Sequence, residues 1–218
     1  EIAQSQAANH KEAVRYWLHN NMITINGQKM GKSLGKFITL NEFFTGQNKS
    51  LDQAYSPMTI RFFILQAQYR STLDFSNFAL QAAKKGYKKI INGLITIKGL
   101  KGSENNSGSD EKLEKEIEKI CTNCYRGMND DFNSAIVIAN LFNLLKYINS
   151  FHNNVIPVNS IKADIFNLMK KTFIDFVEEI LGLKEEKYFD EKFIDDLMDI
   201  LLTSYKKAKD DKDYATVD

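Results

Sequence analysis

Apolar residues recur at steps of three and four positions along most of the chain after residue 40, which is the spacing of one face of an α-helix. In the segment at about 130–150 these positions are Ile136, Ala139, Leu141, Leu144, Leu145 and Ile148. The pattern predicts a long helix from Ser76 to about Ile97, followed by four helical segments at about 110–126, 130–150, 158–182 and 190–209. Short connections separate the last three segments, which predicts antiparallel neighbours in a bundle.

The first part of the chain follows a different pattern. Residues 2–9 can form a short helix, and "RYWLHNNMITINGQKM" then brings aromatic and β-branched residues, with Asn26-Gly27 as a turn signal. This is typical of a short strand that leads into a loop. Thr39 followed by Glu42 is a capping-box signature for the start of a helix.

The sequence therefore predicts a mainly α fold in three parts. Residues 1–38 form a short strand and loop region, residues 39–75 a helical region, and residues 76–218 a C-terminal antiparallel helical bundle. The stretch "KGSENNSGSD", rich in Gly, Ser and Asn, is the clearest loop within the last part.

Composition limits the classes of partner. The formal net charge is +1, from 29 basic and 28 acidic residues, so a polyanion can bind only at a local basic patch. Two cysteines make no disulfide framework and favour a reduced, cytoplasmic setting. No stretch approaches the roughly eighteen apolar residues of a membrane span, so we expect no membrane partner. The N-terminus lacks an initiator Met and a signal-peptide pattern, and we expect a piece of a longer protein.

The stretch "QKMGKSLGKF" contains the strongest candidate for chemistry. Lys29 and Lys32 flank Met30 and Gly31, and Ser33 follows. One interpretation is a solvated surface turn. The other is a mobile loop whose two ammonium groups close over a polyphosphate and neutralise charge that develops during phosphoryl or nucleotidyl transfer. The stretch is not a Walker loop, because the GxxxxGK spacing is missing.

Cysteine and histidine residues give weaker signals. Cys121 and Cys124 are one helical turn apart, which is typical of two small buried residues, and no second pair completes a four-ligand zinc site. The three histidines form no Ser-His-Asp or HExxH arrangement. His19 lies just ahead of the lysine loop, where it is either an active-site group or a partly buried packing residue.

A cluster of lysines occurs in the predicted helix that begins at Ser76. Its members are Lys84, Lys85, Lys88 and Lys89. The ordinary interpretation is the solvated face of the helix, although a phosphate backbone could also use these side chains.

Several longer stretches resemble one family. "KMGKSLGKFITLNEFF" resembles the KMSKS signature of class I aminoacyl-tRNA synthetases, and "EIAQS" and "YWLHN" resemble the segments that precede it in cysteinyl-tRNA synthetases. "IRFFILQAQYRSTLDFS" is similar to the stem-contact helix of that family, and "MNDDFNSAIVIANLF" to the start of its anticodon-binding bundle. The chain is thus identified as a member of this family, namely the C-terminal portion from just before the signature loop.

The resemblance implies a cysteine–tRNA ligase that activates cysteine with ATP and transfers it to tRNA(Cys) in the cytoplasm, most simply as a monomer. It implies that residues 1–38 are a remnant of the catalytic domain, 39–75 the stem-contact region and 76–218 the anticodon-binding bundle. By position, Lys29 and Lys32 would be catalytic. The residues that would bind ATP are Lys29, Met30, Gly31, Lys32, Ser33 and His19.

The resemblance also implies a zinc ion in the full-length enzyme. Glu1 would be the last protein ligand of the zinc that selects the cysteine thiolate. The family carries the other zinc ligands and the HIGH-type nucleotide motif upstream of Glu1. We therefore expect neither bound zinc nor activity from this fragment alone.

Three departures and two alternatives accompany the resemblance. Gly31 replaces the signature serine, Lys36 stands where asparagine is usual, and Gln68 stands where histidine is usual.

One alternative is a stand-alone tRNA-binding or helical interaction module that has lost catalysis. The other is a related ligase that joins cysteine to an amino sugar, against which the long helical region with "MNDDFN" favours a tRNA ligase.

Overall fold

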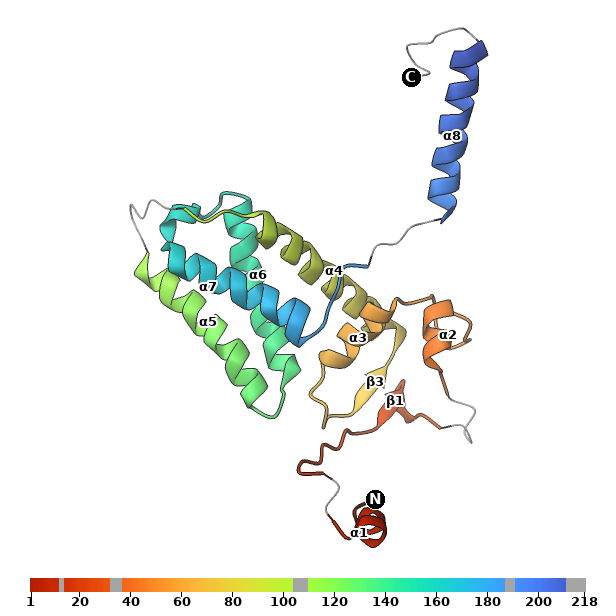
Figure 1. The fold of residues 1–218 in the computed structure, drawn as a ribbon, viewed down its shortest axis with the longest axis vertical. Coiled ribbons are helices and arrows are strands. Elements are labelled where there is room, and N and C mark those ends of the chain that lie inside the picture. The colour runs from red at the N-terminus through yellow and green to blue at the C-terminus, as the bar shows by residue number, and fades with distance from the viewer. Residues whose placement is uncertain (12–13, 32–36, 104–109, 187–190, 211–218) are drawn as a thin grey trace. The chain divides into compact units, whose positions relative to one another are not determined.

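The computed structural model describes all residues except 12–13, 32–36, 104–109, 187–190 and 211–218. The chain divides into two compact units, Glu1–Lys184 and Glu185–Asp218 (Figure 1). The first unit contains a small sheet and most of the helices, and the second contains one described helix, α8 (Glu191–Asp210). No helix in the described ranges is both long and apolar enough to cross a membrane.

The prediction of a mainly α fold with a short strand region is confirmed. The helices of the first unit are α1 (Ile2–Asn9), α2 (Leu40–Thr45), α3 (Pro57–Leu65), α4 (Asn77–Gly99), α5 (Glu111–Asn129), α6 (Ser134–His152) and α7 (Ala163–Ile174). A short 3-10 turn, η2 (Val158–Ser160), precedes α7, and a π-helical segment, η3 (Asp175–Ile180), follows it. The strands are β1 (Ile23–Ile25), β2 (Gln28–Lys29) and β3 (Leu73–Phe75).

The start of α2 is a capping box, as the sequence predicts. The backbone N–H of Thr39 donates to Glu42 Oε2 at 2.7 Å, and the backbone N–H of Glu42 donates to Thr39 Oγ1 at 3.2 Å. These two bonds satisfy N–H groups that a helix start otherwise leaves without partners. The hydrogen bonds from Thr39 also hold the pKa of the Glu42 carboxyl below its ordinary value.

The small sheet has the strand order β2-β1-β3. β1 and β2 form an antiparallel hairpin in which Thr24 lies opposite Lys29, and β1 pairs in parallel with β3. Asn26 and Gly27 make the hairpin turn with φ values of 49° and 74°, which is the left-handed conformation that a two-residue turn of this kind requires. The turn that the sequence predicts is thereby confirmed.

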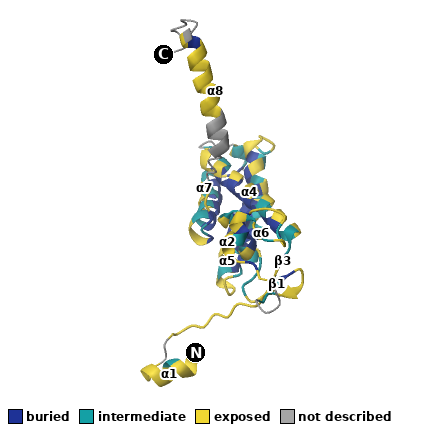
Figure 2. Ribbon diagram, turned by 90° about the vertical axis from the view of Figure 1, so that its right-hand side faces the viewer, coloured by how far each residue is buried: buried dark blue, intermediate teal, exposed yellow. Residues whose placement is uncertain are grey.

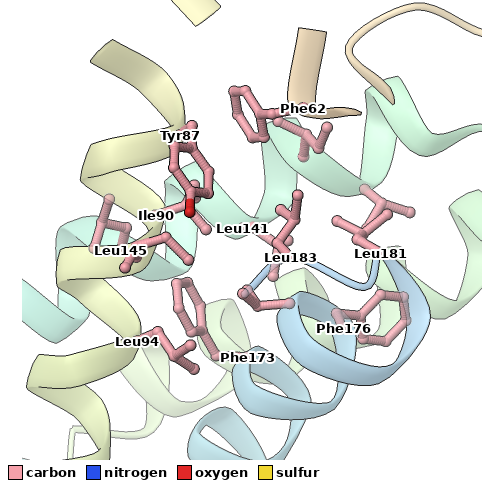
Figure 3. Close-up of a cluster of buried hydrophobic side chains, with 14 of the residues drawn as sticks. Phe62, Tyr87, Ile90, Leu94, Leu141, Leu145, Phe173, Phe176, Leu181 and Leu183 are labelled. Carbon is pink, nitrogen blue, oxygen red and sulfur yellow. The ribbon is translucent and has the colours of Figure 1, made fainter. Parts of the chain in front are cut away.

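Helices α4, α5, α6 and α7 pack together as a bundle around one core. Figure 3 shows Leu94, Leu141 and Phe173 pointing toward one another from three of these helices, and all three are buried. Figure 2 shows the buried residues gathered inside this bundle. The sequence places the helix at about 190–209 among the bundle neighbours, whereas the structure assigns it, as α8, to the second unit. Among the residues of α8 whose burial is described, only Ala208 is buried.

Candidate functional site

The β1–β2 hairpin carries the beginning of the lysine loop. Lys29 is the last residue of β2 and its side chain is exposed. The backbone N–H of Met30 donates to the carbonyl of Ile23 at 3.3 Å, and the Met30 side chain packs partly buried against the core. Lys29, Met30 and the half-buried Gly31 are thus held next to the sheet.

The remainder of the predicted ATP site is only partly described. Lys32 and Ser33 lie outside the described residues, as does Lys36, one of the three departures from the family pattern. The proposed pairing of Lys29 and Lys32 over a polyphosphate therefore stays a prediction.

Asp74 of β3 fixes the hairpin from the neighbouring strand. Its Oδ1 accepts a hydrogen bond from the backbone N–H of Gly27 at 2.7 Å and another from Thr24 Oγ1 at 2.6 Å. The backbone N–H of Asn26 donates in addition to the carbonyl of Phe75 at 3.1 Å. Hydrogen bonds to a carboxylate are stronger than neutral ones, so the turn is held firmly to the strand that leads into α4.

A second anchor joins the connection between α3 and β3 to the turn between α5 and α6. Asp131, in that turn, accepts from Tyr69 Oη at 2.8 Å and pairs with Arg70 Nε at 3.0 Å. Gln68 Nε2 donates to Asp131 Oδ2 at 3.3 Å, so the residue that departs from the family pattern takes part in this cluster. The pKa of the Arg70 guanidinium is raised, first by its side-chain hydrogen bond with Tyr69 and next by the negative charge of Asp131.

The same short segment also holds the chain ahead of the hairpin. The side-chain amide of Asn21 donates to the carbonyl of Arg70 at 2.9 Å, and the backbone N–H of Asn21 donates to the carbonyl of Tyr69 at 3.0 Å. The chain just ahead of the hairpin and the turn between α5 and α6 are therefore both bonded to residues 68–70.

His19 lies two residues ahead of Asn21 and is exposed. Its ring stacks on that of Trp17, with 6.1 Å between the ring centroids and 11° between the ring planes. The partly buried packing position that the sequence allows is therefore wrong, because solvent reaches the ring. A role in binding ATP stays a prediction.

Glu1 does not by itself make a metal site. It is exposed at the start of α1, and its side chain caps no backbone N–H. In the described ranges, no three His, Cys, Asp or Glu side chains lie close enough together to hold a metal ion. A structural zinc needs four ligands, so the residues described here do not fit that ion on their own.

Cys121 and Cys124 are packed inside the bundle, as their spacing in a helix predicts. Both are buried, with exposed fractions of 1% and 0%. Burial raises the pKa of the Cys124 thiol to about 12 and also raises the pKa of Cys121. The pair therefore behaves as two small apolar residues.

Sequence reasoning did not single out Asp74 or Asp131. Each lies far along the chain from the groups it bonds, Asp74 by 47 residues from Gly27 and Asp131 by 62 from Tyr69. Helical and strand periodicity report only local neighbours, so no signal in the pattern could have paired these residues.

Two family models match separate parts of this chain. Residues 1–85, which include the hairpin, residues 68–70 and Asp74, match the family model of the class I (C) tRNA synthetase catalytic domain. Residues 124–185, which include Asp131 and the whole of α6 and α7, match that of the DALR domain. The chain belongs to the class I aminoacyl-tRNA synthetases.

Within that class, its relatives are cysteine–tRNA ligases. The cysteine–tRNA ligases of Cytophaga hutchinsonii and Bacteroides fragilis are 54% and 48% identical to it over 219 and 221 residues. The enzyme of Prochlorococcus marinus is 36% identical over 231 residues. All three comparisons cover 100% of this chain, but the chain spans only 43% to 46% of the length of these relatives.

Proposed function

We propose that the chain is part of a cysteine–tRNA ligase, which activates cysteine with ATP and transfers it to tRNA(Cys). The observation that carries the proposal is the similarity along the whole chain to proteins of that name, with 54% identity to one of them. The hairpin that presents Lys29 at the start of the signature loop, residues 29–33, supports it.

The chemistry of activation gives the lysines their role. A carboxylate oxygen of cysteine attacks the α-phosphate of ATP, the bond to the β-phosphate oxygen breaks, and pyrophosphate leaves. Negative charge grows on the phosphate oxygens during this step. Ammonium groups of Lys29 and Lys32 placed beside them would bind the transition state more strongly than bound ATP, which lowers the barrier.

The hairpin suits a loop of this kind because one end is fixed. Asp74 and β1 hold the turn and β2, so Lys29 needs little reorganisation to reach its place. Gly31 lies two positions after Lys29 and would give the loop backbone freedom to close over the nucleotide. The part of the ligase beyond this chain would supply the floor of the nucleotide site.

The other parts of the chain would bind tRNA. We assign residues 1–38 to the catalytic domain, residues 39–75 to contact with the tRNA stem and residues 76–218 to recognition of the anticodon. Glu1 would complete a zinc site whose other ligands lie outside this chain. The zinc would bind the thiolate of the substrate cysteine, which suits a soft sulfur ligand.

The test uses the complete product of the gene that encodes this chain. It should catalyse cysteine-dependent exchange of pyrophosphate into ATP, and Lys32→Ala or Lys29→Ala should lower the exchange rate about a hundredfold or more. Lys112→Ala, on the exposed side of α5, is the matched control and should leave the rate unchanged.

Two outcomes would contradict the proposal. Absence of cysteine-dependent exchange in the folded full-length protein would favour a binding module without catalysis. If the exchange rates of both loop variants stay within a factor of about three of the wild-type rate, a difference under roughly 1 kcal/mol, the lysines have no catalytic role. The loop would then be a plain surface turn.

A further inference from the structure

Helix α4 concentrates positive charge in a chain that is nearly neutral. The chain carries a formal net charge of +1, whereas α4 alone contains five lysines and no acidic residue. One of them, Lys98, pairs with Glu178 of η3 at 2.7 Å. The other four form no ion pair with any residue in the described part of the chain.

These four lysines lie on the outer side of α4. Gln81, Lys84, Lys85 and Lys88 follow the i, i+3, i+4, i+7 spacing of a single helix face, and Lys89 borders it. We call these five residues the lysine face. The buried residues of the helix occupy the opposite side and include Leu80, Ala83, Tyr87, Ile90, Ile91 and Leu94. The lysine face therefore takes no part in the core.

The lysine face forms one wall of an open groove. A cavity of about 500 Å³ is lined by Gln81, Lys84, Lys85 and Lys88 together with Asp52 and Gln53. The Asn77 side-chain amide, at the start of α4, donates to Asp52 Oδ1 at 2.9 Å and to the carbonyl of Ser50 at 3.1 Å. The facing wall is thus bonded to the helix, so the groove keeps its shape without a ligand.

An exposed aromatic ring stands at the same side of the helix. Phe78 lies seven residues, or two turns, before Lys85. Its side chain is 84% exposed, more than any other large hydrophobic residue in the described ranges. A ring in that position adds nothing to the core, but it can stack on a planar group.

We propose that the lysine face and Phe78 form an RNA-docking surface. The ammonium groups would meet the phosphodiester backbone, and Phe78 would stack on an unpaired base. An acidic protein segment would account for the lysines but not for the exposed ring, whereas RNA offers a row of phosphates and flat bases together. The inference extends the proposed function, from which it takes tRNA as the RNA that occupies the surface.

Binding of a fluorescent tRNA transcript to the 218-residue chain, followed by anisotropy in rising KCl, tests the lysines. Replacing Lys84, Lys85 and Lys88 together by Ala should weaken binding about tenfold or more. It should also reduce the slope of log K against log salt by about two to three, since each lost phosphate contact removes roughly 0.7 to 0.9. Alanine has the highest helix propensity, so its introduction at these positions should leave α4 helical. Circular dichroism of the variant checks this.

The matched control removes the same charge from another helix. Lys112, Lys115 and Lys119 of α5 lie on one helix face, at i, i+3 and i+7, and are exposed. Their joint replacement by Ala should change tRNA affinity less than about twofold. Equal losses in the two triple variants would mean attraction to net charge alone, and would overturn the proposal.

Phe78 and Asp52 give tests of a different kind. Phe78→Ala should weaken binding of tRNA several-fold without changing the salt slope, because stacking releases no counterions, and Phe78→Tyr should restore it. Asp52→Asn removes the acidic group that lines the groove and should tighten binding. Unchanged affinity in Phe78→Ala would overturn the stacking role.

The failure of this inference can be told from failure of the proposed function. Cysteine-dependent pyrophosphate exchange requires no tRNA, so variants of the lysine face in the full-length protein should keep the wild-type exchange rate. If the full-length protein catalyses exchange but the lysine-face variants bind tRNA as tightly as the wild type, the docking surface is wrong and the proposed ligase function is not contradicted. If inorganic triphosphate or ATP competes with tRNA on this face as well as a longer RNA does, the groove is a nucleotide site and the proposal fails.

Discussion

The carboxylate of Asp74 accepts a hydrogen bond of 2.7 Å from the backbone N–H of Gly27, a residue 47 positions earlier in the chain. The same oxygen accepts from Thr24 Oγ1, on the strand opposite Lys29. The geometry of the hairpin turn therefore depends on a strand that follows α3. The signature loop starts from a base that three separate strands define.

We expect Asp74→Ala to loosen this base. Loss of the two acceptor contacts should lower the free energy of unfolding by about 1 kcal/mol and should speed hydrogen exchange at the Gly27 amide about tenfold. Exchange measured by NMR or mass spectrometry reports the local change directly.

Asp74→Asn is the control, because its side-chain oxygen still accepts both bonds. It should retain most of the protection at Gly27. Equal exchange rates in the Ala variant and the wild-type protein would show that the turn is held without Asp74.

Glu114 of α5 is buried, with 5% of its surface exposed, and joins α5 to the start of α7. Its Oε1 accepts from the backbone N–H of Lys162 at 2.8 Å, and its Oε2 lies 3.3 Å from Lys162 Nζ. Glu114→Ala leaves that N–H without its partner and should cost about 2 kcal/mol of stability in urea denaturation. Glu114→Gln keeps an acceptor and should cost clearly less. If the two variants lose the same amount, the ion pair and not the backbone bond carries the effect.

Gly46 ends α2 with a φ of 73°, and a Cβ there would lie 2.8 Å from the backbone nitrogen of Ala54. Gly46→Ala should therefore lower the free energy of unfolding by about 2 kcal/mol, from left-handed strain and from the backbone contact. Gly99, the last residue of α4, has open space around its Cα. Gly99→Ala should be neutral or stabilising by up to about 1 kcal/mol. Similar melting temperatures for the two variants would contradict this reading.

The buried cysteines predict a loss of stability at high pH. Burial raises the pKa of Cys124 to about 12, whereas an unfolded thiol ionises near pH 8.5. The contribution of Cys124 is therefore complete below about pH 8.5 and is lost as the pH rises toward 12, by about 1.4 kcal/mol per pH unit. Burial raises the pKa of Cys121 as well, so its contribution changes with pH in the same direction. Urea unfolding between pH 7.5 and 10.5 should show a steeper decline for the wild-type protein than for the Cys121→Ala/Cys124→Ala variant. Parallel curves would show that the thiols ionise equally in both states.

The parts of the fold that local chemistry determines were predictable. Asn26-Gly27 turns the chain because two successive left-handed residues suit this pair, and Thr39 with Glu42 caps a helix over three positions. The helical spacing of apolar residues likewise located α4 and α6 to within a few residues.

Features that depend on distant residues could not be predicted. The predicted helix at about 158–182 is divided into η2, α7 and η3, because Lys162 is anchored by Glu114 from another helix and the backbone widens to a π-helix at Asp175. The apolar spacing at 190–209 gave a helix correctly but could not tell that α8 belongs to a separate unit. Asp74 and Asp131 were missed for the same reason, since their partners lie far away in the chain.

The parallel pairing of β1 with β3 also sets an order of folding. Ile23 pairs with Leu73, and the chain between these two residues contains α2 and α3. The sheet can therefore close only after both helices have been synthesised. A two-stranded hairpin alone is marginally stable in water, and closing a long loop carries an entropic cost. During translation, the hairpin therefore gains its third strand and its anchoring carboxylate late, after residue 75 has left the ribosome. The base of the signature loop therefore becomes rigid only after the segment from α2 to β3, which follows it in the chain, has been made.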